Sequence, residues 1–98
     1  MPAYLVACIT WNDTGAVERY GKIVVDSLKP FGGRYLARGP ISSVVEGADA
    51  PKRLAIVEFP TLEQAKQWHE SDAYQPALAI RAASATTHWI VFIEGIEK

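Results

Sequence analysis

Residues 4–11 read YLVACITW, and every side chain in this stretch is apolar, aromatic or β-branched. The apolar residues show no helical spacing, and the stretch stops at a turn signal in residues 12–15, so it predicts a β-strand. Successive side chains of a strand point to opposite faces of a sheet. The strand therefore has two apolar faces, one formed by Tyr4, Val6 and Cys8 and the other by Leu5, Ala7, Ile9 and Trp11.

Two later stretches have the same character. Residues 53–59 and 86–94 are predicted as strands with apolar side chains on both faces. A shorter strand is predicted over 34–38 and is ended by Gly39-Pro40, after which 42–51 is predicted as a loop or irregular hairpin. An antiparallel sheet covered on one face normally alternates apolar and polar side chains, and three of these four strands do not.

Helical segments separate the strands. After the first strand, apolar residues recur every three or four positions, which predicts a helix capped by Asp13 or Thr14 and ended by Gly32-Gly33. A capping-box pattern at 61–64 opens a second helix, which breaks and resumes over 76–83. The order β-α-β-β-α-β is that of a ferredoxin-like α+β sandwich with a four-stranded antiparallel sheet.

Two helical segments can cover only one face of such a sheet, so the other face would leave a broad apolar area in water. Most soluble oligomers are two-fold dimers, and a second copy packed sheet against sheet would cover this area. We therefore expect a homodimer formed through the open sheet face. Binding of a different protein to this face is the alternative.

Composition excludes several classes of protein. The 98 residues are expected to form a single domain over 1–98, and the net charge of −1 gives no basic field, so no nucleic-acid partner is expected. The lone Cys8 cannot form an internal disulfide, which favours a reducing compartment. No signal peptide is recognisable, and no apolar run approaches the roughly 20 residues of a membrane span. We expect a cytoplasmic protein that does not enter membranes.

Several short motifs resemble a known family. They are Pro2-Ala3-Tyr4, Tyr20, the block Gly32-Gly33-Arg34-Tyr35-Leu36-Ala37-Arg38-Gly39, Glu46-Gly47, Glu58-Phe59-Pro60 and the series Trp68, Ser71, Tyr74, Leu78 and Arg81. The chain thereby resembles domain-of-unknown-function family 1330 over nearly its whole length. The resemblance implies the dimeric α/β-barrel superfamily, which includes cofactor-free monooxygenases, haem-degrading enzymes and small-molecule sensing domains. It supports the dimer and implies no particular reaction.

Two arginines are candidates for holding an anion. Arg34 and Arg38 are predicted on one side of the short strand, with Leu36 between them. Beside a cavity, a pair of guanidinium groups could hold a carboxylate through paired hydrogen bonds. Alternatively, they form structural ion pairs with Glu46, Glu58 or an acid of the dimer partner.

Two residues are candidates for acid–base chemistry. Glu58 ends an apolar strand, where burial would raise its pKa, although it could equally be the ion-pair partner of an arginine such as Arg81. His69 lies beside Trp68 on the second predicted helix and could exchange a proton near neutral pH, although a solvent-facing histidine is more frequent there. The two histidines lie far apart in the sequence without metal-ligand spacing, so no metal site is predicted.

Aromatic side chains are numerous, and most are expected in the core or the interface. Tyr20 and Tyr74, one on each predicted helix, are the preferred hydroxyl groups for a cleft between helices and sheet. The predicted ligand-binding residues are Tyr20, Arg34, Arg38, Trp68, Tyr74 and Arg81.

The sequence thus predicts a small dimeric protein of uncharacterised function that binds a small apolar or acidic metabolite in a helix–sheet cavity. Cofactor-free catalysis of that metabolite is an open extension, and no cofactor is expected. The alternative is a non-catalytic dimeric interaction or stress-response module.

Overall fold

The computed structural model describes residues 1–47 and 53–96. Its strands are β1 (Ala3–Trp11), β2 (Arg34–Pro40), β3 (Arg53–Phe59) and β4 (Ala85–Glu94). Its helices are α1 (Thr14–Leu28), α2 (Leu62–Glu70) and α3 (Gln75–Ser84), and a short 3-10 helix, η1 (Lys29–Phe31), extends α1. None of the helices in these described ranges is long and apolar enough to cross a membrane.

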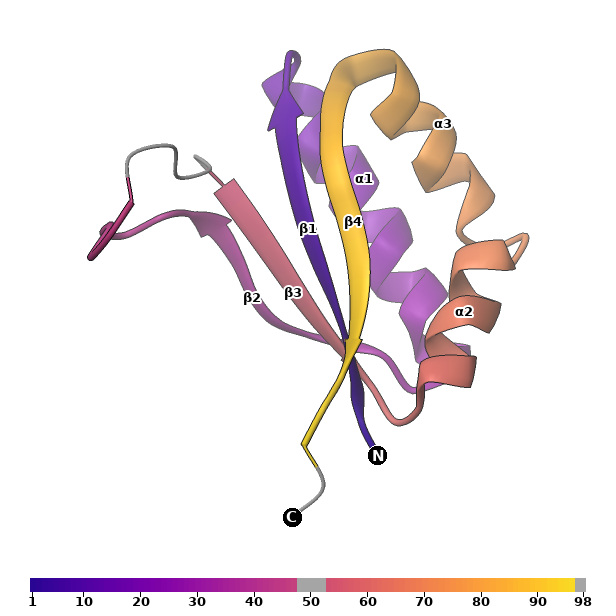
Figure 1. The fold of residues 1–98 in the computed structure, drawn as a ribbon. Helices are drawn as coiled ribbons and strands as arrows, with labels where there is room; N and C mark the ends of the chain where they lie inside the picture. Colours follow the sequence, from indigo (N-terminus) through magenta and orange to yellow (C-terminus); the bar gives the residue numbers. More distant parts are fainter. Residues whose placement is uncertain (48–52, 97–98) are drawn as a thin grey trace.

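The strands form one antiparallel sheet in the order β2-β3-β1-β4. All three α-helices lie on the same side of this sheet (Figure 1). The predicted α+β architecture with a four-stranded antiparallel sheet is therefore confirmed. Within residues 1–47 and 53–96, no helix covers the opposite face of the sheet.

Local hydrogen bonds begin the helices where the sequence predicts them. Asp13 is the N-cap of α1, and its Oδ1 accepts from the backbone N–H of Gly15 at 2.9 Å. Thr61 is the N-cap of α2, and its Oγ1 accepts from the backbone N–H of Gln64 at 3.1 Å. Pro76 lies in the first turn of α3, where its missing N–H breaks no helical hydrogen bond.

Two glycines end the first helical segment for different reasons. Gly32 has a φ of +72°, in the left-handed region that glycine adopts without steric cost. Gly33 is required by space instead, because a Cβ there would lie 2.7 Å from Cδ2 of Leu28 and 2.8 Å from Cε1 of Phe59. The second glycine lets the chain enter β2 in close contact with the core.

The hydrophobic core lies between the helices and one face of the sheet. Leu5 and Ala7 of β1 are buried in it, as predicted for that face of the strand. The other fully buried members come from β3 and the helices: Val57, Phe59, Val24, Leu28, Ala65, Trp68, Tyr74 and Ala77.

β2 contains a β-bulge. Tyr35 pairs with Val57, but the next pair is Ala37 with Ile56, so Leu36 is an extra residue without a partner on β3. The regular alternation of side chains between the two faces is therefore interrupted at Leu36.

The bulge sends the two arginines of β2 to opposite faces. Arg34 is paired with Glu58, on the open face, whereas Arg38 is paired with Ala55, on the helix-covered face. The prediction that Arg34 and Arg38 lie on one side of the strand is wrong, because one extra residue between them shifts the alternation.

β2 also runs two residues further than predicted. Gly39 and Pro40 pair with Leu54 and Arg53, and Pro40 is tolerated because β2 is an edge strand. Of the loop predicted after β2, residues 48–51 lie outside the described residues.

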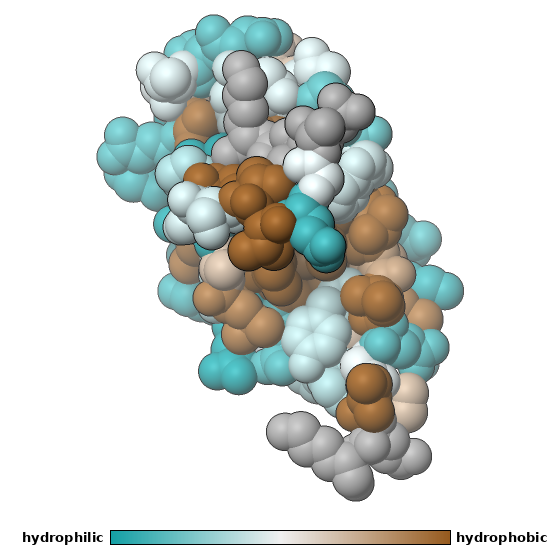
Figure 2. Space-filling model, turned by 60° about the vertical axis from the view of Figure 1, so that its left-hand side comes forward, coloured by the Kyte–Doolittle hydropathy of each residue, from teal (hydrophilic) through white to brown (hydrophobic). Residues whose placement is uncertain are grey.

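The open face of the sheet is apolar and largely exposed. Trp89, Val91 and Ile93 of β4 are 42%, 46% and 59% exposed, respectively. On the same face, Val6 of β1 pairs with Val91 of β4 on one side and with Ile56 of β3 on the other. Apolar side chains gather on this side of the molecule in Figure 2. The sheet is therefore apolar on both faces, as the sequence predicts.

Replacing Gly33 by alanine should lower the free energy of unfolding by about 1–3 kcal/mol, because the methyl group overpacks against Leu28 and Phe59. Gly21→Ala, inside α1, is the control, because its Cβ would meet only the end of the Arg38 side chain. The higher helix propensity of alanine should make this control more stable by roughly 0.5–1 kcal/mol. Urea denaturation followed by circular dichroism measures both. Equal effects would contradict the close contact at Gly33.

Candidate functional site

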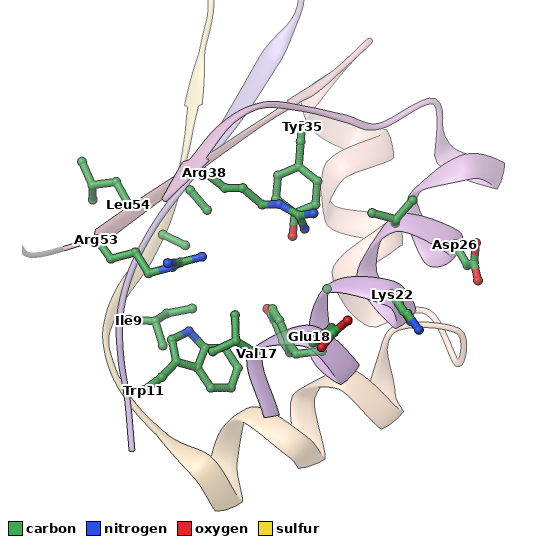
Figure 3. A pocket seen from close by; sticks show the side chains of 15 residues that line it. Ile9, Trp11, Val17, Glu18, Lys22, Asp26, Tyr35, Arg38, Arg53 and Leu54 are labelled. Carbon is green, nitrogen blue, oxygen red and sulfur yellow. The ribbon is translucent and has the colours of Figure 1, made fainter. Parts of the chain in front are cut away.

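A cavity of about 560 Å³ lies between α1 and the part of the sheet formed by β1, β2 and β3 (Figure 3). Its volume is within the range of about 300–1,000 Å³ found for small-molecule sites. Three residues with small side chains or none, Ala7, Gly21 and Ala55, lie in its wall. These positions leave volume between helix and sheet that larger side chains would fill.

Apolar side chains form most of the cavity wall. Trp11 at the end of β1 packs edge-on against Tyr20 of α1, with 5.0 Å between the ring centroids. Further apolar contacts come from the sheet and from α1, through Ile9, Val17 and Val25. The cavity therefore offers one aromatic corner and an aliphatic remainder.

Two arginines bring positive charge to this apolar space. Arg38 lies over the ring of Tyr35, with its Cζ 4.6 Å from the ring centroid, and Arg53 extends into the cavity from β3 (Figure 3). Burial, together with the nearby Tyr20, raises the pKa of Tyr35 to about 12 against the opposing effect of Arg38. The Tyr35 hydroxyl is therefore protonated at neutral pH and can donate a hydrogen bond.

Gly21 gives Arg38 the room that it occupies. A Cβ at Gly21 would lie 3.1 Å from Nη1 of Arg38, so the guanidinium extends from β2 to the surface of α1. A side chain longer than that of alanine at this position of the helix would compete with Arg38 for the same space.

The acidic groups of the cavity come from α1. Asp26 is paired with Lys29 at 3.4 Å, and the ends of Lys22 and Asp26 point away from the centre of the cavity (Figure 3). Glu18 lies on the helix side of the cavity wall. Within residues 1–47 and 53–96, neither Arg38 nor Arg53 forms an ion pair.

A buried polar network lies behind the cavity. Arg81 is only 6% exposed, and its Nη1 donates to the hydroxyl of Tyr20 at 3.2 Å and to the hydroxyl of Tyr74. Burial raises the pKa of Tyr74, so this phenol is a neutral acceptor for the arginine. Tyr20 belongs to both the network and the cavity wall, and it connects the cavity to the buried charge.

Trp68 and Tyr74 line a small adjoining cavity of about 30 Å³, whose wall includes Tyr20 and Tyr35 of the larger cavity. Both are in the core, with 2% and 0% of their surface exposed. Nε1 of Trp68 donates to Oγ of Ser27 at 2.9 Å, which attaches α2 to α1. Both side chains thus hold the helical layer together.

The remaining predicted site residues lie away from the cavity. Nη2 of Arg34 is 2.9 Å from Oε1 of Glu58 on the open face, which is the structural pairing that the sequence left open. His69 packs against Tyr74 and Phe92 on the α2 side, with ring centroids 5.6 Å and 6.4 Å apart. No group of three or more His, Cys, Asp and Glu side chains within the described ranges could hold a metal ion.

Of the predicted site residues, the 560 Å³ cavity brings together Tyr20 and Arg38. Sequence reasoning missed Trp11, Val17, Glu18, Tyr35 and Arg53 as members of its wall. A signal for the helix side exists, because cavity residues of α1 recur at helical spacing: Val17, Glu18, Gly21, Lys22 and Val25. No such signal exists for Arg53, because its position depends on how β3 pairs with its neighbours.

Replacing Tyr74 by phenylalanine should lower the free energy of unfolding by about 1–3 kcal/mol, because buried Arg81 loses a hydrogen-bond acceptor. Tyr4→Phe is the matched control, because its hydroxyl makes no side-chain hydrogen bond among the described residues. Thermal and urea denaturation measure both variants. A Tyr74→Phe protein as stable as the control would show that the network contributes nothing to stability.

The free energy of unfolding should decrease at alkaline pH because of the raised pKa of Tyr35. The unfolded chain loses the Tyr35 proton near 10.0 and the folded protein near about 12, so the folded state binds more protons between these values. The free energy of unfolding therefore decreases as pH rises through this window, by up to about 1.4 kcal/mol per pH unit from this residue. Urea denaturation at a series of pH values should show a shallower decrease for Tyr35→Phe. An identical decrease in the free energy of unfolding for the wild type and Tyr35→Phe would contradict the raised pKa of Tyr35.

Solved structures share this fold at low sequence identity. A protein of unknown function from Rhodopseudomonas palustris has a TM-score of 0.76 and 14% identity, over 99% of this chain and 84% of that one. A dimeric ferredoxin-like protein of unknown function from Jannaschia sp. CCS1 has a TM-score of 0.71 and 16% identity, over 97% of this chain and 100% of that one. SnoaB, a cofactor-independent oxygenase from Streptomyces nogalater, has a TM-score of 0.70 and 8% identity, over 99% of this chain and 95% of that one. These similarities show a shared ferredoxin-like fold.

A search of curated proteins finds no match. The family profile described as Domain of unknown function (DUF1330) matches residues 2–96, which is nearly the whole chain. The resemblance indicated by the motifs of residues 32–39 is thereby confirmed. The chain belongs to the DUF1330 family.

Proposed function

We propose that this protein is a homodimer that binds a small, mainly apolar molecule in the cavity between α1 and the sheet. The observation that carries the proposal is the 560 Å³ cavity itself, an apolar space with a few polar groups at defined positions. Trp11 and Tyr20 supply an aromatic wall, and Tyr35 and Arg38 supply hydrogen-bond donors.

The open face of the sheet supports the dimer. Exposed Trp89, Val91 and Ile93 form an apolar area that water solvates poorly, and a second copy would bury it without any further domain. A structural neighbour from Jannaschia sp. CCS1 is a dimeric ferredoxin-like protein. We assign the open face of the sheet as the contact between the two copies.

The proposal is for binding and leaves turnover open. Glu58 and His69, the residues named for proton transfer, lie outside the cavity wall. Of the two carboxylates in the wall, Asp26 is paired with Lys29, so Glu18 is the group through which a proton could leave a bound ligand. SnoaB, a neighbour by fold, is a cofactor-independent oxygenase, so chemistry without a cofactor is compatible with this architecture.

A second candidate function is a non-catalytic interaction module. The exposed apolar face favours it, because the same surface that would join two copies could bind a different protein. A module that binds a different protein through this face would be a monomer when purified alone. A non-catalytic dimeric module would have the mass of two chains, and the ligand titration below distinguishes it from a ligand-binding dimer.

Light scattering coupled to size-exclusion chromatography should give twice the chain mass of 10.8 kDa. Val91→Glu should reduce the mass to that of one chain, because it places a charge between the exposed apolar side chains of Trp89 and Ile93 on the open face. Val45→Glu is the control, because Val45 is 93% exposed outside the sheet. A wild-type mass of one chain, or a dimer that survives Val91→Glu, would contradict an interface on this face.

Titration with 2-naphthamide, a neutral flat apolar probe, should shift the NMR amide signals of Trp11, Val17 and Tyr35. Val17→Phe fills the cavity from α1 and should weaken binding at least about tenfold, because buried ligands need matching space. Val45→Phe makes the same substitution at an exposed position and should bind like the wild type. Shifts confined to β4, or equal binding by both variants, would show that the cavity is not the site.

A further inference from the structure

We propose that the ligand of the cavity is a small carboxylic acid with a flat apolar body, bound as its anion with the carboxylate at Arg38. This inference rests on the proposed function, because it names the chemical class of the molecule that the cavity takes. It differs from the expectation of an Arg34–Arg38 pair, since Arg34 lies on the other face of the sheet in an ion pair with Glu58.

Arg38 has the position that carboxylate binding requires. The ring of Tyr35 supports one side of its guanidinium, and the bare backbone of Gly21 lets it reach across to α1. The guanidinium of Arg38 forms no ion pair within the described residues. A guanidinium held in this way offers parallel N–H donors, the geometry that matches the two oxygens of a carboxylate.

Two neighbouring groups reinforce the same end of the cavity. The Tyr35 hydroxyl, protonated at neutral pH, is a donor beside Arg38, and Arg53 brings a second positive charge from β3 (Figure 3). An anion would meet donors from two strands here. A neutral ligand would leave the excess positive charge of the cavity wall without a counter-charge.

The charge balance favours a single negative charge on the ligand. Lys22 and Asp26 carry opposite charges on α1, and their ends point away from the centre of the cavity (Figure 3). The remaining charged groups of the wall are Arg38, Arg53 and Glu18, whose formal charges leave one positive charge. A monocarboxylate neutralises this excess, whereas a doubly charged phosphate would reverse it next to Glu18.

The rest of the cavity determines the body of the acid. Trp11 and Tyr20 meet edge to face, and Val17 and Ile9 add aliphatic surface. Apart from the Trp11 indole N–H and the Tyr20 hydroxyl, which already accepts from Arg81, these side chains offer no hydrogen-bond partners to a sugar or a peptide. They fit an aromatic ring system, which gains from burial and from contact with the aromatic corner.

The test compares 2-naphthoate with 2-naphthamide, two probes of nearly the same shape that differ in charge. Calorimetric or NMR titration at neutral pH and low salt should give tighter binding of the anion by about tenfold or more, because a hydrogen bond to a charged group is stronger than a neutral one. Added salt should reduce this preference.

A pair of arginine variants assigns the preference to the cavity. Arg38→Gln should remove the preference for naphthoate while 2-naphthamide still binds, because glutamine keeps an amide donor without the charge. Arg34→Gln, the matched change on the opposite face, should keep the full preference. Circular dichroism checks that both variants are folded.

The outcomes separate this inference from the proposed function. Binding of both probes in the cavity with equal affinity, or loss of the preference in Arg34→Gln alone, overturns the carboxylate assignment and leaves the binding cavity standing. If neither probe shifts the NMR amide signals of the cavity residues, both the carboxylate assignment and the proposed binding cavity are overturned. Preference for naphthoate that disappears only in Arg38→Gln supports the assignment.

Discussion

A sheet with two apolar faces and one layer of helices is the constraint on which the rest of this protein depends. Leu5 and Val57 are buried beneath the helices, while Val91 and Trp89 remain exposed on the other side. We propose that a second copy of the chain covers the apolar area on the open side. On the covered side, the small residues Ala7, Gly21 and Ala55 leave space between α1 and the sheet as a cavity.

The bulge at Leu36 distributes charge between the two faces. It directs Arg34 to the open face, where Glu58 neutralises it, so this edge of the apolar surface carries no unbalanced charge. It directs Arg38 to the covered face, where an apolar cavity gains a positive group. Behind the cavity, a second arginine, Arg81, is held by tyrosine hydroxyls alone among the described residues. The extra residue in an edge strand thus separates a structural cation from one that is available to a ligand.

Local sequence patterns predict the helices and strands of the fold, but they do not predict which residues form the cavity wall. Asp13 and Thr61 begin helices through hydrogen bonds to residues two or three positions away, so short sequence windows contain the signal. The face on which Arg38 lies depends instead on pairing with β3, and nothing within β2 itself marks Leu36 as the extra residue. Sequence reasoning likewise named Trp68 as a binding residue, because an aromatic side chain does not show whether a core or a ligand will contact it. The placement of Arg53 in the wall requires the complete sheet.

A crystal structure of the protein grown with 2-naphthoate tests the central claim most directly, because it observes interface and cavity together. Our account predicts two copies packed through the exposed face of β4, β1 and β3, with the naphthoate ring beside Trp11 and its carboxylate on the guanidinium of Arg38. Copies that leave Val91 in solvent, together with a probe bound on the sheet surface or absent from the cavity, would contradict it.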